Sequence, residues 1–327
     1  MQSRVLIALC LAASAHASLI GAGPGSIRTP LAAPKSAFPA APARRTSGLD
    51  RSIASIMPIH PITNKLLGVP ITEATTFALS LLATAPGFNS FVHFFSTGYG
   101  LSMAAMASAT MGSTMITTPA AMVHNFGCAV HGARLAHFVT NRPSWKSRDD
   151  RLKEIDAKFS TGKRAKVWVA YSALYALMFT PCLAHIRNPA FANSLVPAKV
   201  RGPMVAAGLA IQWAGIAIET VSDNAKQSHK KQLLEAKKKD TWLETGLYSK
   251  TRHPNYLGEA MVHAGSLLAG APAMTGVLQA AGAALGTAGI SFSLLASVKK
   301  YDAIAEKKYG KKYKEYMART GGMLPKL

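Results

Sequence analysis

Residues 203–223 read PMVAAGLAIQWAGIAIETVSD. From Met204 to Ile218 the segment has no charged residue, and then Glu219 and Asp223 follow four positions apart on one helical face. An acid at hydrocarbon depth is costly unless it has a partner. The segment therefore predicts a membrane helix whose acids bind a ligand. The alternative is a helix end with ordinary salt bridges, because Lys226 and Lys230 continue the same face.

Comparable apolar segments recur along the chain, and 49% of its 327 residues are hydrophobic. They cover approximately residues 72–95, 100–123, 124–140, 166–186, 203–222, 257–271 and 273–298. The pattern predicts an all-α, polytopic membrane helix bundle with about six to seven transmembrane helices. The segments 124–140 and 257–271 carry His or Glu, so we expect short, tilted or broken helices that line a cavity. Gly282 and Gly286 predict a close helix contact.

The formal net charge of +22 is concentrated in two lysine clusters that each follow an apolar segment, Lys226–Lys239 and Lys299–Lys314. Basic residues next to membrane spans are typical of the side that faces the cytosol or stroma. The lysines flank candidate membrane spans instead of covering a soluble fold, so we expect no nucleic-acid partner.

Cysteine and histidine spacings predict no metal site. The chain has three cysteines and neither a CxxC motif nor the number of cysteines that a disulfide framework needs. His124, His131 and His137 share an apolar region, but their spacings lack the close pairs of a histidine-box diiron enzyme. We expect these histidines to be packed or hydrogen-bonded.

The N-terminus has the features of a targeting sequence. Residues 1–17 combine Arg4, an apolar run and an Ala-x-Ala end, which predicts a signal peptide. Residues 18–50 are rich in Ala, Pro and Ser with basic residues, which is typical of a transit peptide. This order resembles the bipartite presequence of algae with secondary plastids. It favours a plastid membrane, with the endoplasmic reticulum second, and leaves residues 51–327 as the membrane domain. The alternative is a disordered N-terminal arm.

A second polar segment, GLYSKTRHPNYLGEAMVHAG at residues 246–265, lies at the start of an apolar stretch. Pro254 prevents a continuous helix through Arg252 and His253, so a new helix is expected to begin there. A helix N-terminus with Arg, His and Asn255 suits a phosphate or another anion. The alternative is an anchor at headgroup depth, where Tyr and Arg are common.

Three segments carry a family resemblance: RLAHFVTNRPSWKSRDDR (134–151), ETVSDNAKQSHK (219–230) and GLYSKTRHPNYLGE (246–259). Together they resemble the membrane-bound steroid 5-alpha-reductase-like superfamily, specifically its uncharacterised bacterial and algal branch. The resemblance implies an all-helical membrane fold whose C-terminal half binds NADPH. The cofactor-binding residues that it implies are Glu219, Asp223, Lys230, Arg252, His253, Asn255, Tyr256 and Glu259.

The implied reaction is reduction of a carbon–carbon double bond in a lipophilic sterol, isoprenoid or lipid-like substrate, with a hydrogen-bond donor on the conjugated carbonyl. The sequence does not identify that donor, and Tyr99 and His124 are only candidates. The expected partners are the substrate and membrane lipid. The alternative is an S-adenosylmethionine-dependent membrane methyltransferase of the isoprenylcysteine or phospholipid type, which shares the Arg-His-Pro-x-Tyr-x-Gly element and an ending similar to EKKYGKKYKEY (306–316). A membrane scaffold or transporter is a third possibility.

Overall fold

The computed structural model describes residues 65–66, 69–113, 118–142 and 146–326. They belong to one compact unit, Asn64–Leu327. The predicted signal peptide, the transit-like segment and the first residues of the predicted membrane domain lie outside the described residues.

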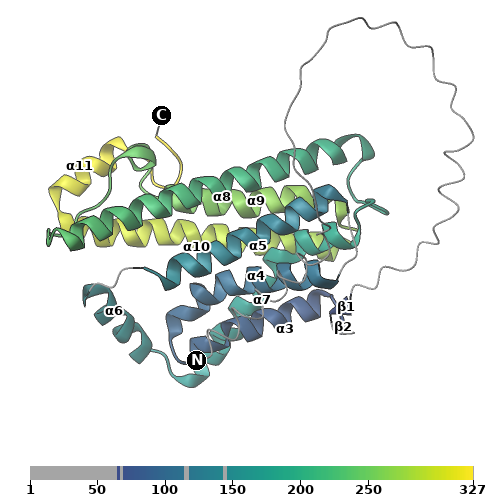
Figure 1. Ribbon diagram of the computed structural model, residues 1–327, viewed down its shortest axis with the longest axis horizontal. Helices are drawn as coiled ribbons and strands as arrows, with labels where there is room; N and C mark the ends of the chain where they lie inside the picture. Colours follow the sequence, from purple (N-terminus) through teal and green to yellow (C-terminus); the bar gives the residue numbers. More distant parts are fainter. Residues whose placement is uncertain (1–64, 67–68, 114–117, 143–145, 327) are drawn as a thin grey trace, which may run out of the picture. The chain divides into compact units, whose positions relative to one another are not determined.

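The described chain is helical apart from one small strand pair, which confirms the all-α prediction (Figure 1). Its α-helices are α3 (Glu73–Thr84), α4 (Thr97–Ser113), α5 (Pro119–Thr140), α6 (Lys146–Ala157), α7 (Thr161–Arg187), α8 (Ala198–Glu235), α9 (Pro254–Gly270), α10 (Val277–Tyr309) and α11 (Lys311–Arg319). Short 3-10 helices are η1 (Ala85–Phe88), η2 (Phe91–Phe95), η3 (Gly246–Ser249) and η4 (Ala271–Ala273). Strand β1 (Lys65–Leu66) pairs antiparallel with β2 (Val69–Pro70).

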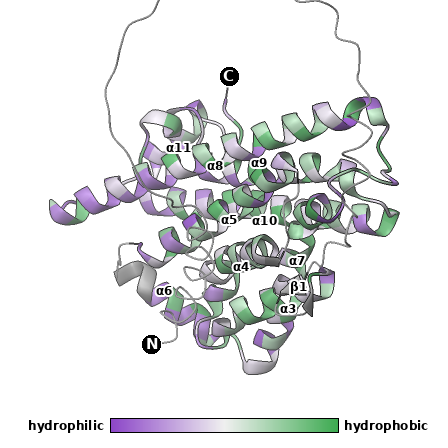
Figure 2. Cartoon of the chain, turned by 45° about the vertical axis from the view of Figure 1, so that its right-hand side comes forward, coloured by the Kyte–Doolittle hydropathy of each residue, from purple (hydrophilic) through white to green (hydrophobic). Residues whose placement is uncertain are grey.

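Three of the described helices, α7, α8 and α10, are long and apolar enough to cross a membrane. This agrees with an integral membrane protein. Helix α3 has 12 residues, which is too few for a span, and α4 and α9 have 17 residues each, at the lower limit of the roughly 17–25 residues that a span needs. The structure thus supports three spans, and the count of six to seven stays a prediction. Figure 2 shows hydrophobic residues along much of the bundle and hydrophilic residues around α6 and α11.

Local signals explain where several helices begin. The side chain of Thr72 accepts a hydrogen bond from the backbone of Thr75 and so caps α3. Thr118 caps α5 in the same way, with Pro119 in the first turn. Helix α9 begins at Pro254, as predicted, because proline suits a first turn but not a helix interior.

Glycines let the helices that carry the polar residues approach closely. Helix α8 packs along α9. A Cβ atom on Gly215 would lie 2.5 Å from the carbonyl oxygen of Gly258, so the two backbones are in direct contact. This contact brings Glu219, one turn after Gly215, against α9. The predicted contact at Gly286 is confirmed, since a Cβ atom there would lie 2.7 Å from the backbone of Leu177 on α7.

The main hydrophobic core lies among α4, α5, α7 and α10, and it includes Met103, Met106, Met178, Phe179 and Leu183. These five side chains are fully buried. Burial of side chains of this size contributes about 1.5–3 kcal/mol each. The core holds α4 and α5 in place beside the polar residues described next.

Candidate functional site

Four helices of the bundle bring polar side chains together in its interior. We call this group the inner polar cluster. Its members are Tyr99 on α4, His131 and Arg134 on α5, Glu219 and Asp223 on α8, and Glu259 and His263 on α9. All of them except Arg134 are buried. Because groups of this kind are costly inside an apolar bundle, a cluster of them indicates a functional site.

The hydroxyl of Tyr99 lies between two imidazole rings. It is hydrogen-bonded to Nε2 of His263 at 2.5 Å and to Nε2 of His131 at 3.2 Å. The ring of Tyr99 stacks on Tyr175 with the centroids 4.9 Å apart, which fixes its direction. A hydroxyl held this way can donate a hydrogen bond to a substrate oxygen and recover a proton from an imidazole.

Arg134 links the two acids that the sequence singled out. Its guanidinium forms an ion pair with Glu219 through Nη2, and Nη1 lies 2.9 Å from Oδ2 of Asp223. Glu219 also contacts His131, with 3.1 Å between Oε2 and Nδ1. Tyr99, His131, Glu219 and Arg134 therefore form a continuous chain of polar groups, which can shift protons or charge along its length.

Several atoms in or beside this cluster are buried without a hydrogen-bond partner in the described part of the chain. They are Nε of Arg134, Oδ1 of Asp223 and, at the start of α9, Oδ1 of Asn255. Glu259 lies close enough to Tyr99 and Glu219 to interact electrostatically with both. Unpartnered buried polar atoms are uncommon, and they suit a ligand that offers hydroxyl or amide groups.

Basic side chains adjoin the cluster beyond Asp223. Lys226, the next residue on this face of α8, lies within electrostatic range of Asp223, Arg142 and Lys230. Lys230 forms an ion pair with Asp240 and donates to the carbonyl of Thr241 at 2.7 Å. Positive charge therefore lies beside Asp223, on the side of the cluster toward Lys226.

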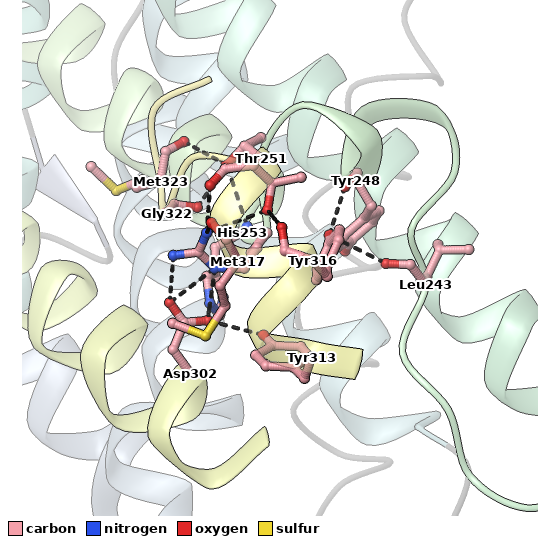
Figure 3. Close-up of polar contacts among 12 residues, drawn as sticks. Leu243, Tyr248, Thr251, His253, Asp302, Tyr313, Tyr316, Met317, Gly322 and Met323 are labelled. Carbon is pink, nitrogen blue, oxygen red and sulfur yellow. Dashed lines mark hydrogen bonds and ion pairs between the residues drawn. The ribbon is translucent and has the colours of Figure 1, made fainter. Parts of the chain in front are cut away.

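The expected anion site at Arg252 and His253 is filled by a carboxylate of the chain itself, Asp302 on α10. Nη2 of Arg252 lies 2.9 Å from Oδ2 of Asp302, and Nε2 of His253 lies 3.0 Å from Oδ1. The hydroxyl of Tyr313 donates to Oδ1 at 3.0 Å. Figure 3 shows His253 and Tyr313 converging on Asp302. We call these four residues the Asp302 cluster.

The Asp302 cluster holds the C-terminal segment against the start of α9. Nη1 of Arg252 donates to the carbonyl of Thr320 at 2.6 Å, and the Thr251 hydroxyl donates to the carbonyl of Gly322 at 2.7 Å (Figure 3). Burial lowers the pKa of His253, against the opposing hydrogen bond and charge of Asp302. This geometry gives Arg252 and His253 a positioning role.

The eight sequence-predicted site residues thus fall into separate groups. Glu219, Asp223 and Glu259 belong to the inner polar cluster, whereas Arg252 and His253 belong to the Asp302 cluster. The remaining three lie elsewhere: Lys230 at Asp240, Asn255 with one unpartnered oxygen, and Tyr256 stacked on His253 with centroids 5.2 Å apart. Sequence reasoning did not assign Arg134, His263 or Asp302 to the site.

A shallow groove of 340 Å³ lies beside α8 on the side of Ser222. Polar residues of α8, including Ser228, His229 and Gln232, line it together with Leu243 and Tyr248 from the segment before α9. The Tyr248 hydroxyl donates to the carbonyl of Ser222 at 3.2 Å and so links this segment to α8. Mixed polar and apolar lining of this kind suits a small organic group.

Comparison with known proteins places the chain in one family. Residues 81–320 match the family described as protein of unknown function (DUF1295), and the chain belongs to it. Searches of curated proteins and of solved structures return no match. The matched region includes every member of the inner polar cluster and of the Asp302 cluster.

Proposed function

We propose that this member of the DUF1295 family is a membrane-bound, NADPH-dependent reductase of a carbon–carbon double bond in a lipophilic substrate. The observation that carries the proposal is the buried Tyr99 hydroxyl, hydrogen-bonded to His131 and His263 beside the carboxyl groups of Glu219 and Glu259. The resemblance of residues 134–151, 219–230 and 246–259 to steroid 5-alpha-reductase-like proteins supports the same reaction.

The donor set of the site suits a phosphorylated dinucleotide. Oδ1 of Asp223 and Nε of Arg134 are buried and lack a hydrogen-bond partner within the described residues, so they can bind ribose hydroxyls or a carboxamide. Lys226, with Arg142 and Lys230 in electrostatic range, provides positive charge for phosphate. Because Asp302 already neutralises Arg252, we assign phosphate binding to Lys226 and Lys230 of α8 and not to Arg252.

The chain's own residues would act on the substrate as follows. Tyr99 donates a hydrogen bond to the carbonyl that is conjugated with the double bond, which stabilises negative charge on that oxygen as it develops. Tyr99 then passes its proton to the substrate, which completes the reduction, and His263 and His131, which hold the hydroxyl in position, return a proton to it. NADPH, when bound, supplies the hydride. Helices α4, α5, α8 and α9 keep bulk water away from these groups.

A binding measurement on the full chain, purified in detergent, tests this proposal. We expect NADPH to bind, and Asp223→Asn and Lys226→Met to weaken it about tenfold to a hundredfold, because each removes a charged partner of the ligand. Lys238→Ala, an exposed change beyond the end of α8, is the matched control and should leave affinity unchanged. Binding of S-adenosylmethionine with no affinity for NADPH would instead support the methyltransferase.

A further inference from the structure

A second group of ligating side chains lies outside the inner polar cluster, between α5 and α7. His124 and Cys128 are four residues apart on α5, and Cys182 and His185 are three residues apart on α7. Both spacings put the two side chains on one face of their helix. The exposed fractions are 0% for His124, His185 and Cys182, and 1% for Cys128, so the bundle encloses all four.

The ligand atoms of three of these residues converge, and the fourth residue, His185, contacts one of them. One ring nitrogen of His124 and the two thiol sulfurs all lie within 4.8 Å of one another. Nδ1 of His185 lies 3.1 Å from Nδ1 of His124. Around a tetrahedral Zn²⁺ ion, with bonds of about 2.0 Å to nitrogen and 2.3 Å to sulfur, neighbouring ligand atoms are about 3.3–3.8 Å apart. The ligand atoms of His124, Cys128 and Cys182 already lie near that geometry, and His185, which contacts His124, completes it when its ring turns toward the two sulfurs.

We infer that His124, Cys128, Cys182 and His185 form a structural Zn²⁺ site. Two imidazoles and two thiolates are a donor set that zinc prefers, and four protein ligands leave no open position for catalysis. The charge also balances. Each thiol loses its proton on binding, so two thiolates and one Zn²⁺ ion make a neutral unit that an apolar bundle can bury at low cost.

The surroundings orient the ligands. Nε2 of His124 is hydrogen-bonded to the hydroxyl of Ser266 on α9 at 2.7 Å, which leaves Nδ1 to face the metal. The amide of Gln212 on α8 approaches the sulfur of Cys128 at 3.5 Å and can donate to a thiolate there. Zinc would therefore join α5 and α7 directly and hold them to α8 and α9 through these two contacts. Helices α5, α8 and α9 also carry residues of the inner polar cluster.

Metal analysis of the purified full chain is the first test, with elemental mass spectrometry as the readout. We expect about one zinc ion per chain. Cys128→Ser and Cys182→Ser should reduce zinc to a small fraction of that value. His137→Asn, an exposed histidine on the same helix α5, should retain it. A wild-type chain without zinc, or full zinc content in Cys128→Ser, would overturn the inference.

X-ray absorption at the zinc edge of the wild-type protein keeps the inference testable if the cysteine variants do not fold. We expect two sulfur and two nitrogen neighbours, at about 2.3 Å and 2.0 Å. A shell of oxygen and nitrogen alone would mean that zinc binds elsewhere and would refute the site. Detection of a Cys128–Cys182 disulfide in the purified chain would also refute it, because oxidised sulfurs cannot serve as thiolate ligands.

Discussion

Replacing Arg134 by methionine measures how much the ion pairs of the inner polar cluster contribute to the stability of the protein. Arg134 is 15% exposed, whereas its partners Glu219 and Asp223 are 2% and 3% exposed. Methionine keeps much of the side-chain volume but removes the positive charge that both acids contact. Two buried carboxyl groups then lose their shared partner. Removal of one partner from a buried ion pair typically costs about 3–5 kcal/mol.

Unfolding of the detergent-purified protein measures this cost. For a chain with this many ordered residues, about 3–5 kcal/mol corresponds to a fall in Tm on the order of 10 °C. Lys231→Met on α8 is the matched control, since Lys231 and Glu235 are 69% and 65% exposed and their nitrogen and oxygen atoms are 3.8 Å apart. An exposed pair of this kind contributes less than about 1 kcal/mol.

A triple variant tests whether unpaired buried charge causes the loss of stability in Arg134→Met. Combining Arg134→Met with Glu219→Gln and Asp223→Asn removes the charges that Arg134→Met alone leaves buried and unpaired. Most of the lost stability should return, because neutral amides are less costly to bury than carboxylates. If Arg134→Met melts within about 2 °C of wild type, or if the triple variant is no more stable than the single variant, the buried ion-pair reasoning is refuted.

Three further predictions concern the Asp302 cluster and the two lysines that pair with Asp240. Asp302→Asn removes the carboxylate that Arg252 and His253 bind, so residues 320–326 should become sensitive to protease and the free energy of unfolding should fall by about 2–3 kcal/mol. An unchanged digestion pattern would show that Asp302 does not hold the C-terminal segment. Because burial lowers the pKa of His253, the unfolded chain binds a proton more readily than the folded chain, and stability should decline as the pH falls below about 6.5. In His253→Gln, stability measured against pH should change less steeply below this pH. An unchanged slope in the variant would contradict this role of His253. Asp240 pairs with Lys230 of α8 and with Lys308 of α10, so the segments 223–250 and 299–327 should be cleaved from the same side of sealed vesicles, whereas protection of only one would contradict this topology.

Local physical chemistry made some features predictable from sequence. Pro254 allows a helix to begin but not to continue, and α9 begins there. The apolar run before Glu219 required a partner for that acid, and the structure supplies Arg134 and His131.

Contacts between distant helices were not predictable. Arg134 is 89 residues from Asp223, and no local pattern states which helix faces α8. In the sequence Asp302 lies among lysines and resembles an ordinary surface acid, although in the structure it pairs with Arg252 and is hydrogen-bonded to His253. The spacings of His124 to Cys128 and of Cys182 to His185 are visible in the sequence, but only the packing of α5 on α7 brings the two pairs together.

Transfer of deuterium from NADPH labelled at C4 of the nicotinamide tests the central claim most directly. Purified protein is incubated with this cofactor and a lipid extract of the source membranes, and products are examined by mass spectrometry. We expect a product heavier than its precursor by one deuterium on carbon and one hydrogen, formed by wild type and lost in Tyr99→Phe, while Lys238→Ala forms it normally. A product that gains a methyl group from labelled S-adenosylmethionine, with no deuterium transfer, would contradict the reductase.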